Sequence, residues 1–381
     1  MSLIPVSAVS DRLPTFPWDK LEPYKKTAAA HPDGIVDLSV GTPVDPVPEL
    51  IQKALVAAAD SPGYPTVWGT PELRDAITGW AGRRLGARGV THRHVLPVVG
   101  SKELVAWLPT QLGLGPGDKV AYPRLAYPTY EVGARLARAD HLVYTVTSGA
   151  DAPGPTDLDP TNLKLLWLNS PSNPTGRVLG KEELTRIVAW AREHGVLVFS
   201  DECYLELGWE ADPVSVLHPD VNGGSYDGIV AVHSLSKRSN LAGYRAAFLV
   251  GDPAVLGPLL QIRKHGGMMT SAPTQAAVVA ALGDDTHVRE QRERYAARRA
   301  VLREALLNHG FRIEHSEASL YLWATRGESC WDTVAHLADR GILVAPGDFY
   351  GTAGATFVRV ALTATDERVA AAAARLGDGS R

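Results

Sequence analysis

The segment with the clearest chemical content is His233–Arg245, which reads HSLSKRSNLAGYR and directly follows the apolar run IVAV. If that run is a strand, the segment lies at the end of a sheet strand, where ligands of open α/β sheets gather. Ser234, Ser236 and Arg245 can donate charge-assisted hydrogen bonds to a phosphate dianion, and the planar guanidinium suits a bidentate contact. Lys237 can form a Schiff base with a carbonyl. The pattern therefore predicts a phosphate site beside a reactive amine.

Two further polar segments also follow strand-like runs. Asn169–Gly176 reads NSPSNPTG, which by composition is a turn. Ser200–Tyr204 reads SDECY, so Asp201 ends an apolar run. An unpaired carboxylate at the end of a buried strand is costly and requires a cationic partner. A protonated pyridine nitrogen would supply that cation.

These three segments, in this order, resemble the pattern of class I and II aminotransferases, which are enzymes of pyridoxal 5′-phosphate (PLP) fold type I. The resemblance runs from the triplet GTP at Gly41 to the segment FVRVA at Phe357. It implies PLP as the cofactor. It also implies an α/β fold in which a large domain with a mostly parallel seven-stranded sheet stands beside a smaller α+β domain.

The resemblance assigns three catalytic residues. Lys237 matches the lysine that binds the cofactor covalently and later moves a proton between substrate and cofactor. Asp201 matches the aspartate that pairs with the pyridine nitrogen and keeps it protonated, which makes the ring an electron sink. Tyr204, together with Asn173, matches the residues that donate hydrogen bonds to the phenolic oxygen of the ring.

Further cofactor contacts follow from two other motifs. Gly100, Ser101 and Lys102, in GSKE after the run VLPVV, resemble a glycine-rich turn whose backbone N–H groups meet the phosphate at a helix N-terminus. Ser234, Ser236 and Arg245 would complete that phosphate site. Tyr127, in PRLAYPTY, matches the aromatic residue that stacks on the pyridine ring, and its rival Tyr130 is expected to pack nearby.

The substrate and the partner subunit are predicted in the same way. Arg359 resembles the small-domain arginine that binds the substrate α-carboxylate bidentately, and it lies in an alternating strand pattern. Gly41 and Asn173 match residues close to the same carboxylate. Tyr64 resembles a tyrosine that reaches the phosphate site of the other subunit, which implies a homodimer with shared active sites. Amino acids and 2-oxo acids are the implied substrates, while Trp68, beside the Tyr64 segment, has no assigned role.

The N-terminal text FPWDKLEPYKKTAAAHPDGIVDLSVGTPVDPVP resembles actinobacterial N-succinyl-LL-diaminopimelate aminotransferases of lysine and cell-wall biosynthesis. That likeness implies a ping-pong exchange with 2-oxoglutarate and glutamate through pyridoxamine phosphate. Three alternatives stay open: an aminotransferase for aspartate, alanine or aromatic amino acids, a PLP-dependent C–S lyase, and a non-catalytic regulator. A substrate with a second carboxylate requires a cation besides Arg359, and the candidates are Arg12, Lys25, Arg124 and Arg263.

The elements that must position these residues are visible in the hydrophobic pattern. Between residues 50 and 300, strand-length apolar runs alternate with amphipathic segments, a pattern typical of βαβ units and a mostly parallel sheet. Lys181–His194 places its apolar residues on one helical face and ends at Gly195. The predicted strands are Val95–Val99, Lys119–Tyr122, Leu163–Leu168, Val196–Phe199, Ile229–Val232 and Ala246–Val250.

The sequence pattern changes near Asp285, and the new pattern predicts the smaller domain. Its elements are a charged helix, three short strands and an alanine-rich final helix, at Val288–His309, Phe311–Ile313, Leu320–Ala324, Thr356–Ala361 and Asp366–Leu376. We expect a large PLP-binding domain over residues 45–280. Residues 1–44 would form an N-terminal arm that joins residues 281–381 in the small domain.

Composition limits the other functional classes. The chain has 381 residues, 45% hydrophobic and 21% charged, with a net charge of −4, and it has no long Lys/Arg run of the kind that binds nucleic acid. Cys203 and Cys330 are the two cysteines, so no disulfide framework is expected. We find neither an export signal nor an apolar run long enough to cross a membrane. The expectation is a cytoplasmic enzyme without a metal, a membrane or a nucleic-acid partner.

Overall fold

The computed structural model describes residues 7–145 and 155–377, and the structural statements below concern these residues. Its largest sheet has seven strands in the order β2-β8-β7-β6-β5-β3-β4. Neighbouring strands are parallel except where β8 pairs with β2 and β7. The strands are β2 (Val95–Val98), β3 (Lys119–Pro123), β4 (Asp140–Tyr144), β5 (Leu163–Asn169), β6 (Leu197–Asp201), β7 (Ile229–Ser234) and β8 (Ala247–Gly251).

The helices alternate with these strands over most of the chain. The α-helices are α1 (Ser7–Ser10), α2 (Glu22–Ala29), α3 (Glu49–Ala57), α4 (Pro71–Leu85), α5 (Ser101–Gln111), α6 (Thr129–Ala137), α7 (Lys181–Glu193), α8 (Pro219–Asn222), α9 (Leu235–Arg238), α10 (Pro253–His265), α11 (Ala272–Gly283), α12 (Thr286–Asn308), α13 (Cys330–Ala338) and α14 (Asp366–Gly377). Short 3₁₀ helices lie at Pro17–Leu21, His92–His94, Pro155–Asp157, Ala242–Tyr244, Gly347–Tyr350 and Thr352–Gly354.

The seven-stranded sheet is covered on both faces, as its continuous apolar strands require. Successive residues of a strand point to opposite faces. In β5, Leu166 and Leu168 pack with α3, α4, α7 and α11, whereas Leu165 and Trp167 pack with α5, α6 and α10. The result is a three-layer α/β/α region.

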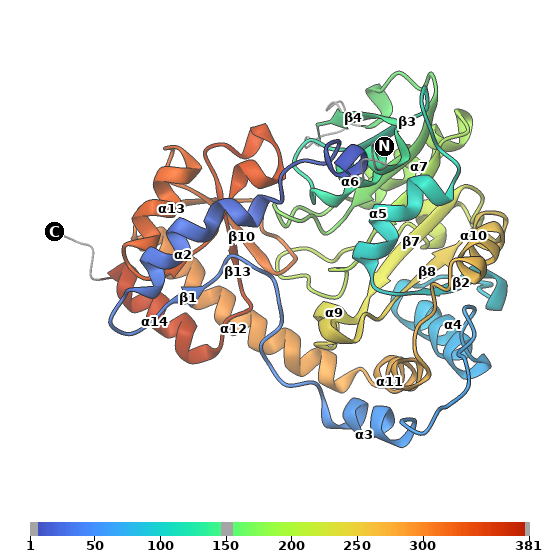
Figure 1. Ribbon diagram of the computed structural model, residues 1–381, viewed down its shortest axis with the longest axis horizontal. Coiled ribbons are helices and arrows are strands. Elements are labelled where there is room, and N and C mark those ends of the chain that lie inside the picture. Colours follow the sequence, from blue (N-terminus) through green and yellow to red (C-terminus); the bar gives the residue numbers. More distant parts are fainter. Residues whose placement is uncertain (1–6, 146–154, 378–381) are drawn as a thin grey trace, which may run out of the picture.

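A smaller region lies beside it, at the left of Figure 1, and contains α2, α13 and α14. Its four-stranded sheet has the order β12-β13-β10-β9, and two further strands, β1 and β11, pair with each other. Leu21 and Val36 from the N-terminal part share one buried cluster with Leu302, Val334 and other C-terminal residues. The strands are β1 (Val36–Asp37), β9 (Arg312–Glu314), β10 (Tyr321–Thr325), β11 (Ile342–Leu343), β12 (Ala345–Pro346) and β13 (Val358–Ala361).

The predicted fold class is confirmed, including the seven-stranded, mostly parallel sheet. All six strands named from the sequence lie in that sheet, and their ends differ from the predicted ones by at most two residues. The seventh, β4, was missed because this edge strand is mostly exposed and has no continuous apolar run. The short strands β1, β11 and β12 were missed because two residues carry no periodic pattern.

Candidate active site

The site begins where three adjacent parallel strands end. In the register of the sheet, Asn169 at the end of β5 lies opposite Asp201 at the end of β6. Asp201 lies in turn opposite Val232 of β7, two residues before Ser234. Because carboxyl ends of parallel strands meet at one edge, the three predicted segments converge there, as the sequence analysis expected.

A cavity of about 710 Å³ opens at this edge, between the two regions of the molecule. Most of the sequence-predicted site residues line it: Gly41, Ser101, Lys102, Tyr127, Asn173, Asp201, Tyr204, Ser234, Ser236, Lys237, Arg245 and Arg359. Phe16, Trp18, Val40, Thr42, Asn169, Cys203, Ala242 and Tyr321 also line it and were not predicted. Two predicted residues, Gly100 and Tyr64, do not belong to the lining.

Lys237 lies in the short helix α9, directly after β7, and its amine faces the cavity. Its Nζ donates a hydrogen bond to the carbonyl oxygen of Gly41. Burial lowers the pKa of this amine below its ordinary value, and the nearby charges of Arg359 and Arg245 act in the same direction. A lysine of this kind has an increased neutral fraction, which is the form that attacks a carbonyl or accepts a proton.

Asp201 is buried and has no cationic partner among the described residues. Its Oδ2 accepts a hydrogen bond from the Tyr130 hydroxyl at 2.8 Å, and its Oδ1 accepts one from the Cys203 amide at 3.2 Å. Burial raises the pKa of this carboxyl group, while these hydrogen bonds oppose the rise. A buried carboxylate that accepts hydrogen bonds but has no cationic side chain beside it can pair with a cationic ring nitrogen in the cavity.

The sequence predicted only a packing role for Tyr130, but its hydroxyl also donates the hydrogen bond to Asp201. Its side chain is fully buried and stacks on Trp167, with ring centres 5.0 Å apart. Tyr127, the predicted stacking residue, lines the cavity and meets Tyr130 edge-on at 6.0 Å. Tyr127 therefore forms part of the cavity wall, whereas Tyr130 contacts Asp201.

Groups that can donate hydrogen bonds to a phosphate also line the cavity. The Ser234 and Ser236 hydroxyls lie 2.9 Å apart, and Ser101 begins α5, whose first N–H groups have no helical partner. Gly100 precedes Ser101 with a φ of 80°, and an added Cβ there would overlap the Arg245 guanidinium. Gly100 therefore contributes space for Arg245, although it does not line the cavity.

Arg359, on β13, is 3% exposed and forms the base of the cavity in the smaller region. Its Nη1 donates to Asn173 Oδ1 at 2.9 Å, and its Nη2 donates to the Ser39 carbonyl at 2.7 Å. Because Asn173 uses its carbonyl oxygen in this contact, its amide N–H groups remain for a ligand. The hydrogen bond therefore holds the Arg359 and Asn173 side chains together at the cavity.

Tyr64 is 97% exposed and does not line the cavity. Trp68, four residues later, lies under the guanidinium of Arg74, whose central carbon is 4.1 Å from the ring centre. That contact gives Trp68 a packing role within its own chain.

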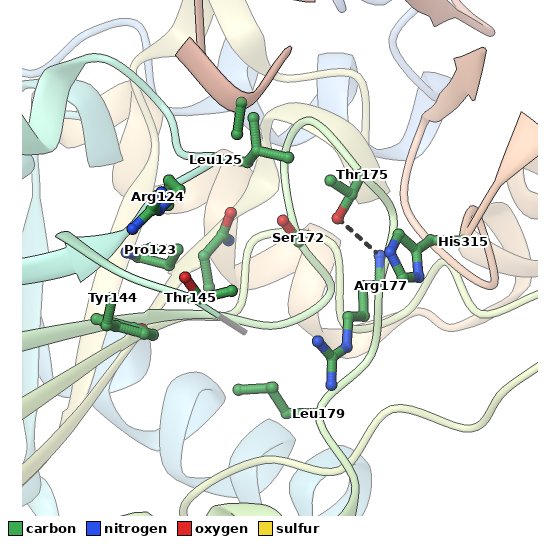
Figure 2. Close-up of a pocket in the computed structure, with 12 residues that line it drawn as sticks. Pro123, Arg124, Leu125, Tyr144, Thr145, Ser172, Thr175, Arg177, Leu179 and His315 are labelled. Atoms are coloured by element: carbon green, nitrogen blue, oxygen red, sulfur yellow. Dashed lines mark hydrogen bonds between the residues drawn. The ribbon is translucent and has the colours of Figure 1, made fainter. Parts of the chain in front are cut away.

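The four cations proposed for a second carboxylate do not line the cavity. Arg263 is fully buried and pairs with Glu103 at 2.8 Å. Arg124 lines a separate pocket of about 120 Å³, and Figure 2 shows it there together with Arg177 and His315. This pocket shares Asn169 with the cavity and lies beside Thr145, the last described residue before the gap at 146–154.

Together these groups fit PLP by three independent observations. A buried amine of lowered pKa can hold an aldehyde, and a carboxylate without a cation can hold a pyridine nitrogen. Serine hydroxyls, a helix N-terminus and Arg245 can hold a phosphate. Among the described residues there is no cluster of three metal-ligating side chains, and no helix is long and apolar enough to cross a membrane.

Comparisons with known proteins agree with this geometry. A protein-family model described as aminotransferase class I and II matches residues 33–376. The chain is 61% identical to the 4-dedimethylamino-4-oxo-anhydrotetracycline transaminase OxyQ of Streptomyces rimosus, over 96% of this chain and 99% of that protein. It is 63% identical to the probable aminotransferase Rv1178 of Mycobacterium tuberculosis, over 97% of this chain and 86% of that protein.

A solved structure extends the likeness to the fold. It is titled as a probable N-succinyldiaminopimelate aminotransferase from Thermus thermophilus and superposes with a TM-score of 0.85 at 28% identity. The match covers 95% of this chain and all of the other.

Proposed function

The chain belongs to the class I and II aminotransferase family, whose enzymes depend on PLP, and on that premise we propose that it transfers an amino group from N-succinyl-LL-2,6-diaminopimelate to 2-oxoglutarate. The observation that carries the reaction class is the meeting of Lys237, Asp201 and Arg359 in one cavity. The substrate assignment is supported by the N-terminal likeness and by the Thermus structure.

The proposed mechanism assigns one task to each part of the cavity. Bound PLP supplies an aldehyde that captures the amino group and a ring that withdraws electrons. Lys237 would hold that aldehyde and would accept the Cα proton, because its lowered pKa increases the neutral fraction of the amine, which is the form that takes up a proton. Asp201 holds the ring nitrogen, and Tyr204 and Asn173 donate to the phenolic oxygen. Arg359 would bind the substrate carboxylate in the same cavity as Lys237.

A distal carboxylate on this substrate requires one more cation. Among the described residues that line the cavity, the cations are Lys102, Lys237, Arg245 and Arg359. The last three already have roles, so we propose that Lys102 contacts the distal carboxylate in addition to its place in the phosphate turn. Its ammonium lies 5.5 Å from the centre of the Phe16 ring, at the mouth of the cavity.

We also propose a homodimer, in which Tyr64 completes the phosphate site of the partner. Support comes from the surface of residues 40–64, which exposes Val40, Val44, Leu50, Val56 and Tyr64. Exposed apolar side chains in this number on one segment favour an interface. The division into residues 45–280 and residues 1–44 with 281–381 is part of the same proposal, and the shared N- and C-terminal cluster supports it.

A second candidate substrate comes from the similarity to OxyQ. At 61% identity, transfer of an amino group to a polycyclic ketone, as in the substrate that the name of OxyQ states, is the alternative. The donor amino acid would still require Arg359, so that residue does not separate the two substrates.

The test is a panel of substrates added to the purified, PLP-loaded protein while its visible spectrum is recorded. N-succinyl-LL-diaminopimelate and glutamate are expected to convert the coenzyme to the pyridoxamine form. Conversion by glutamate together with amination of the ketone, and no response to the succinylated substrate, would support the OxyQ-like alternative. Pyruvate and ammonia released from cystathionine without a keto acid would indicate a C–S lyase. A protein that cannot be loaded with PLP would contradict the whole proposal.

A further inference from the structure

Tyr321, at the start of β10, lies between Arg359 and Tyr204. Strands β10 and β13 pair antiparallel, with Trp323 opposite Arg359 and Tyr321 opposite Ala361. Alternate residues of a strand share a face, so Tyr321 and Arg359 are diagonal neighbours on one face, within reach of long side chains. The register of the small sheet therefore brings an aromatic ring to the arginine.

The Arg359 guanidinium lies over the face of the Tyr321 ring. The central guanidinium carbon is 3.9 Å from the ring centre, and both side chains are 3% exposed. A second ring, that of Tyr350, lies 4.8 Å from the same carbon. A cation held over aromatic faces away from water is stabilised more strongly than an exposed one. The two rings thus limit the orientations in which the Arg359 guanidinium can direct its N–H groups toward a ligand.

The hydroxyl of Tyr321 makes a different contact. It lies 3.0 Å from the Tyr204 hydroxyl, and the two rings meet edge-on with centres 5.6 Å apart. A side chain at Gly41 would overlap this hydroxyl, and the carbonyl of the same glycine accepts the hydrogen bond from Lys237. The hydroxyl therefore occupies a narrow space that Gly41 keeps open.

The charges around the two phenols differ. Burial raises the pKa of both, but the charges of Arg359 and Lys237 lower the pKa of Tyr321 below its ordinary value, while that of Tyr204 stays well above it. Either hydroxyl can be the donor across this 3.0 Å contact. A hydroxyl has one proton, so if Tyr204 donates to a ligand in the cavity, as proposed above, Tyr321 must donate to the Tyr204 oxygen.

We propose that Tyr321 is a positioning residue with two separable parts. Its ring holds the Arg359 guanidinium in the plane that receives the substrate carboxylate. Its hydroxyl donates to Tyr204, so that Tyr204 donates to the phenolic oxygen of the cofactor. This inference rests on the proposed function, because it takes the roles of Arg359 and Tyr204 from there.

The experiment separates the ring from the hydroxyl with two variants. Tyr321→Phe keeps the ring, so binding of glutarate, an unreactive dicarboxylate, should stay within twofold of wild type. The pH midpoint of the visible coenzyme band should rise by roughly half to one pH unit, since Tyr204 becomes a weaker donor to the phenolic oxygen. Tyr321→Met fills the space without a ring, and its affinity for glutarate should fall about tenfold or more.

Tyr295→Phe is the matched control. Tyr295 is buried in the same cluster and does not line the cavity. This variant should move neither the midpoint nor glutarate binding.

An unmoved midpoint in Tyr321→Phe overturns the role of the hydroxyl, and unchanged glutarate affinity in Tyr321→Met overturns the role of the ring. If Tyr321→Met does not fold, a loss of glutarate affinity above fivefold in Tyr321→Phe overturns the separation of the two parts, and a smaller change supports it. A wild-type protein that binds no PLP would contradict the proposed function but not the role of the Tyr321 ring. That role can still be tested by measuring glutarate binding to the apoprotein by calorimetry.

Discussion

The hydrogen bond from Tyr130 to Asp201 leads to the sharpest test of the electrostatics of the site. Replacing Tyr130 by phenylalanine removes one hydroxyl and leaves the ring stacked on Trp167. The carboxyl group of Asp201 then keeps its hydrogen bonds from Cys203, whose amide N–H donates at 3.2 Å. Since the Tyr130 bond lowers the pKa of Asp201 against the effect of burial, its loss raises that pKa further.

The magnitude follows from the energy of a hydrogen bond to a charged group, about 1.5 to 3 kcal/mol. If the whole of this energy stabilises the ionised form of Asp201 in the transition state, kcat/KM falls by roughly ten- to a hundredfold. The sign of the pH effect is also determined. Asp201 must be ionised to hold a protonated ring nitrogen, so a higher pKa moves the acid limb of the kcat/KM profile to higher pH.

The assay is kcat/KM across pH for wild type, Tyr130→Phe and Tyr144→Phe. Tyr144 is the matched control, because its buried hydroxyl donates at 2.7 Å to the carbonyl of Trp167, a neutral acceptor. Both variants lose one buried hydrogen bond and should show similar decreases in thermal stability, but only Tyr130→Phe should lose activity in this range. A Tyr130→Phe enzyme with kcat/KM within twofold of wild type and the same acid limb would refute the reasoning.

Three further substitutions test other parts of the cavity. Lys237→Ala should abolish steady turnover while PLP still binds, as measured by rate assays and by coenzyme content after gel filtration; near-normal rates would exclude Lys237 as the catalytic amine. Gly100→Ala should weaken PLP retention at least tenfold, because the added methyl overlaps the Arg245 guanidinium and the backbone φ is 80°. A dialysis series with equal coenzyme loss in both proteins would contradict this. Arg359→Lys should raise KM for the amino donor more than it lowers PLP affinity, since an ammonium cannot form a bidentate contact; equal effects on both would contradict the substrate role.

The chemistry at the strand ends was the most predictable part of the molecule. Strands such as Leu163–Asn169 and Ile229–Ser234 are continuous apolar runs followed at once by polar residues, so both the element and the exposed end are visible in the sequence. The parallel order of those strands then requires that Asp201 and Lys237 lie at one edge. Local pattern and sheet topology together place these residues.

Contacts set by strand register were not predictable in this way. Tyr321 reaches Arg359 only because β10 and β13 pair with Trp323 opposite Arg359, and no local pattern encodes that register. Tyr130 was recognised as a neighbour of the site, but its hydroxyl contact depends on how α6 packs against β6. Cation candidates such as Arg263 could not be ranked for a similar reason, because its partner Glu103 lies 160 residues away.

The two glycines at the cavity have a consequence for the divergence of related enzymes. At Gly41 an added methyl group would overlap the buried Tyr321 ring, and at Gly100 it would meet the Arg245 guanidinium on a backbone with a φ of 80°, so a side chain at either position requires a neighbour or the backbone to move. Substitutions at the rim, at Phe16, Val40 or Thr42, meet no such barrier because these side chains are exposed. New substrate preferences in this lineage are therefore expected to arise at the mouth of the cavity, and a mutant library aimed at a new amino donor should vary the mouth and leave the floor intact.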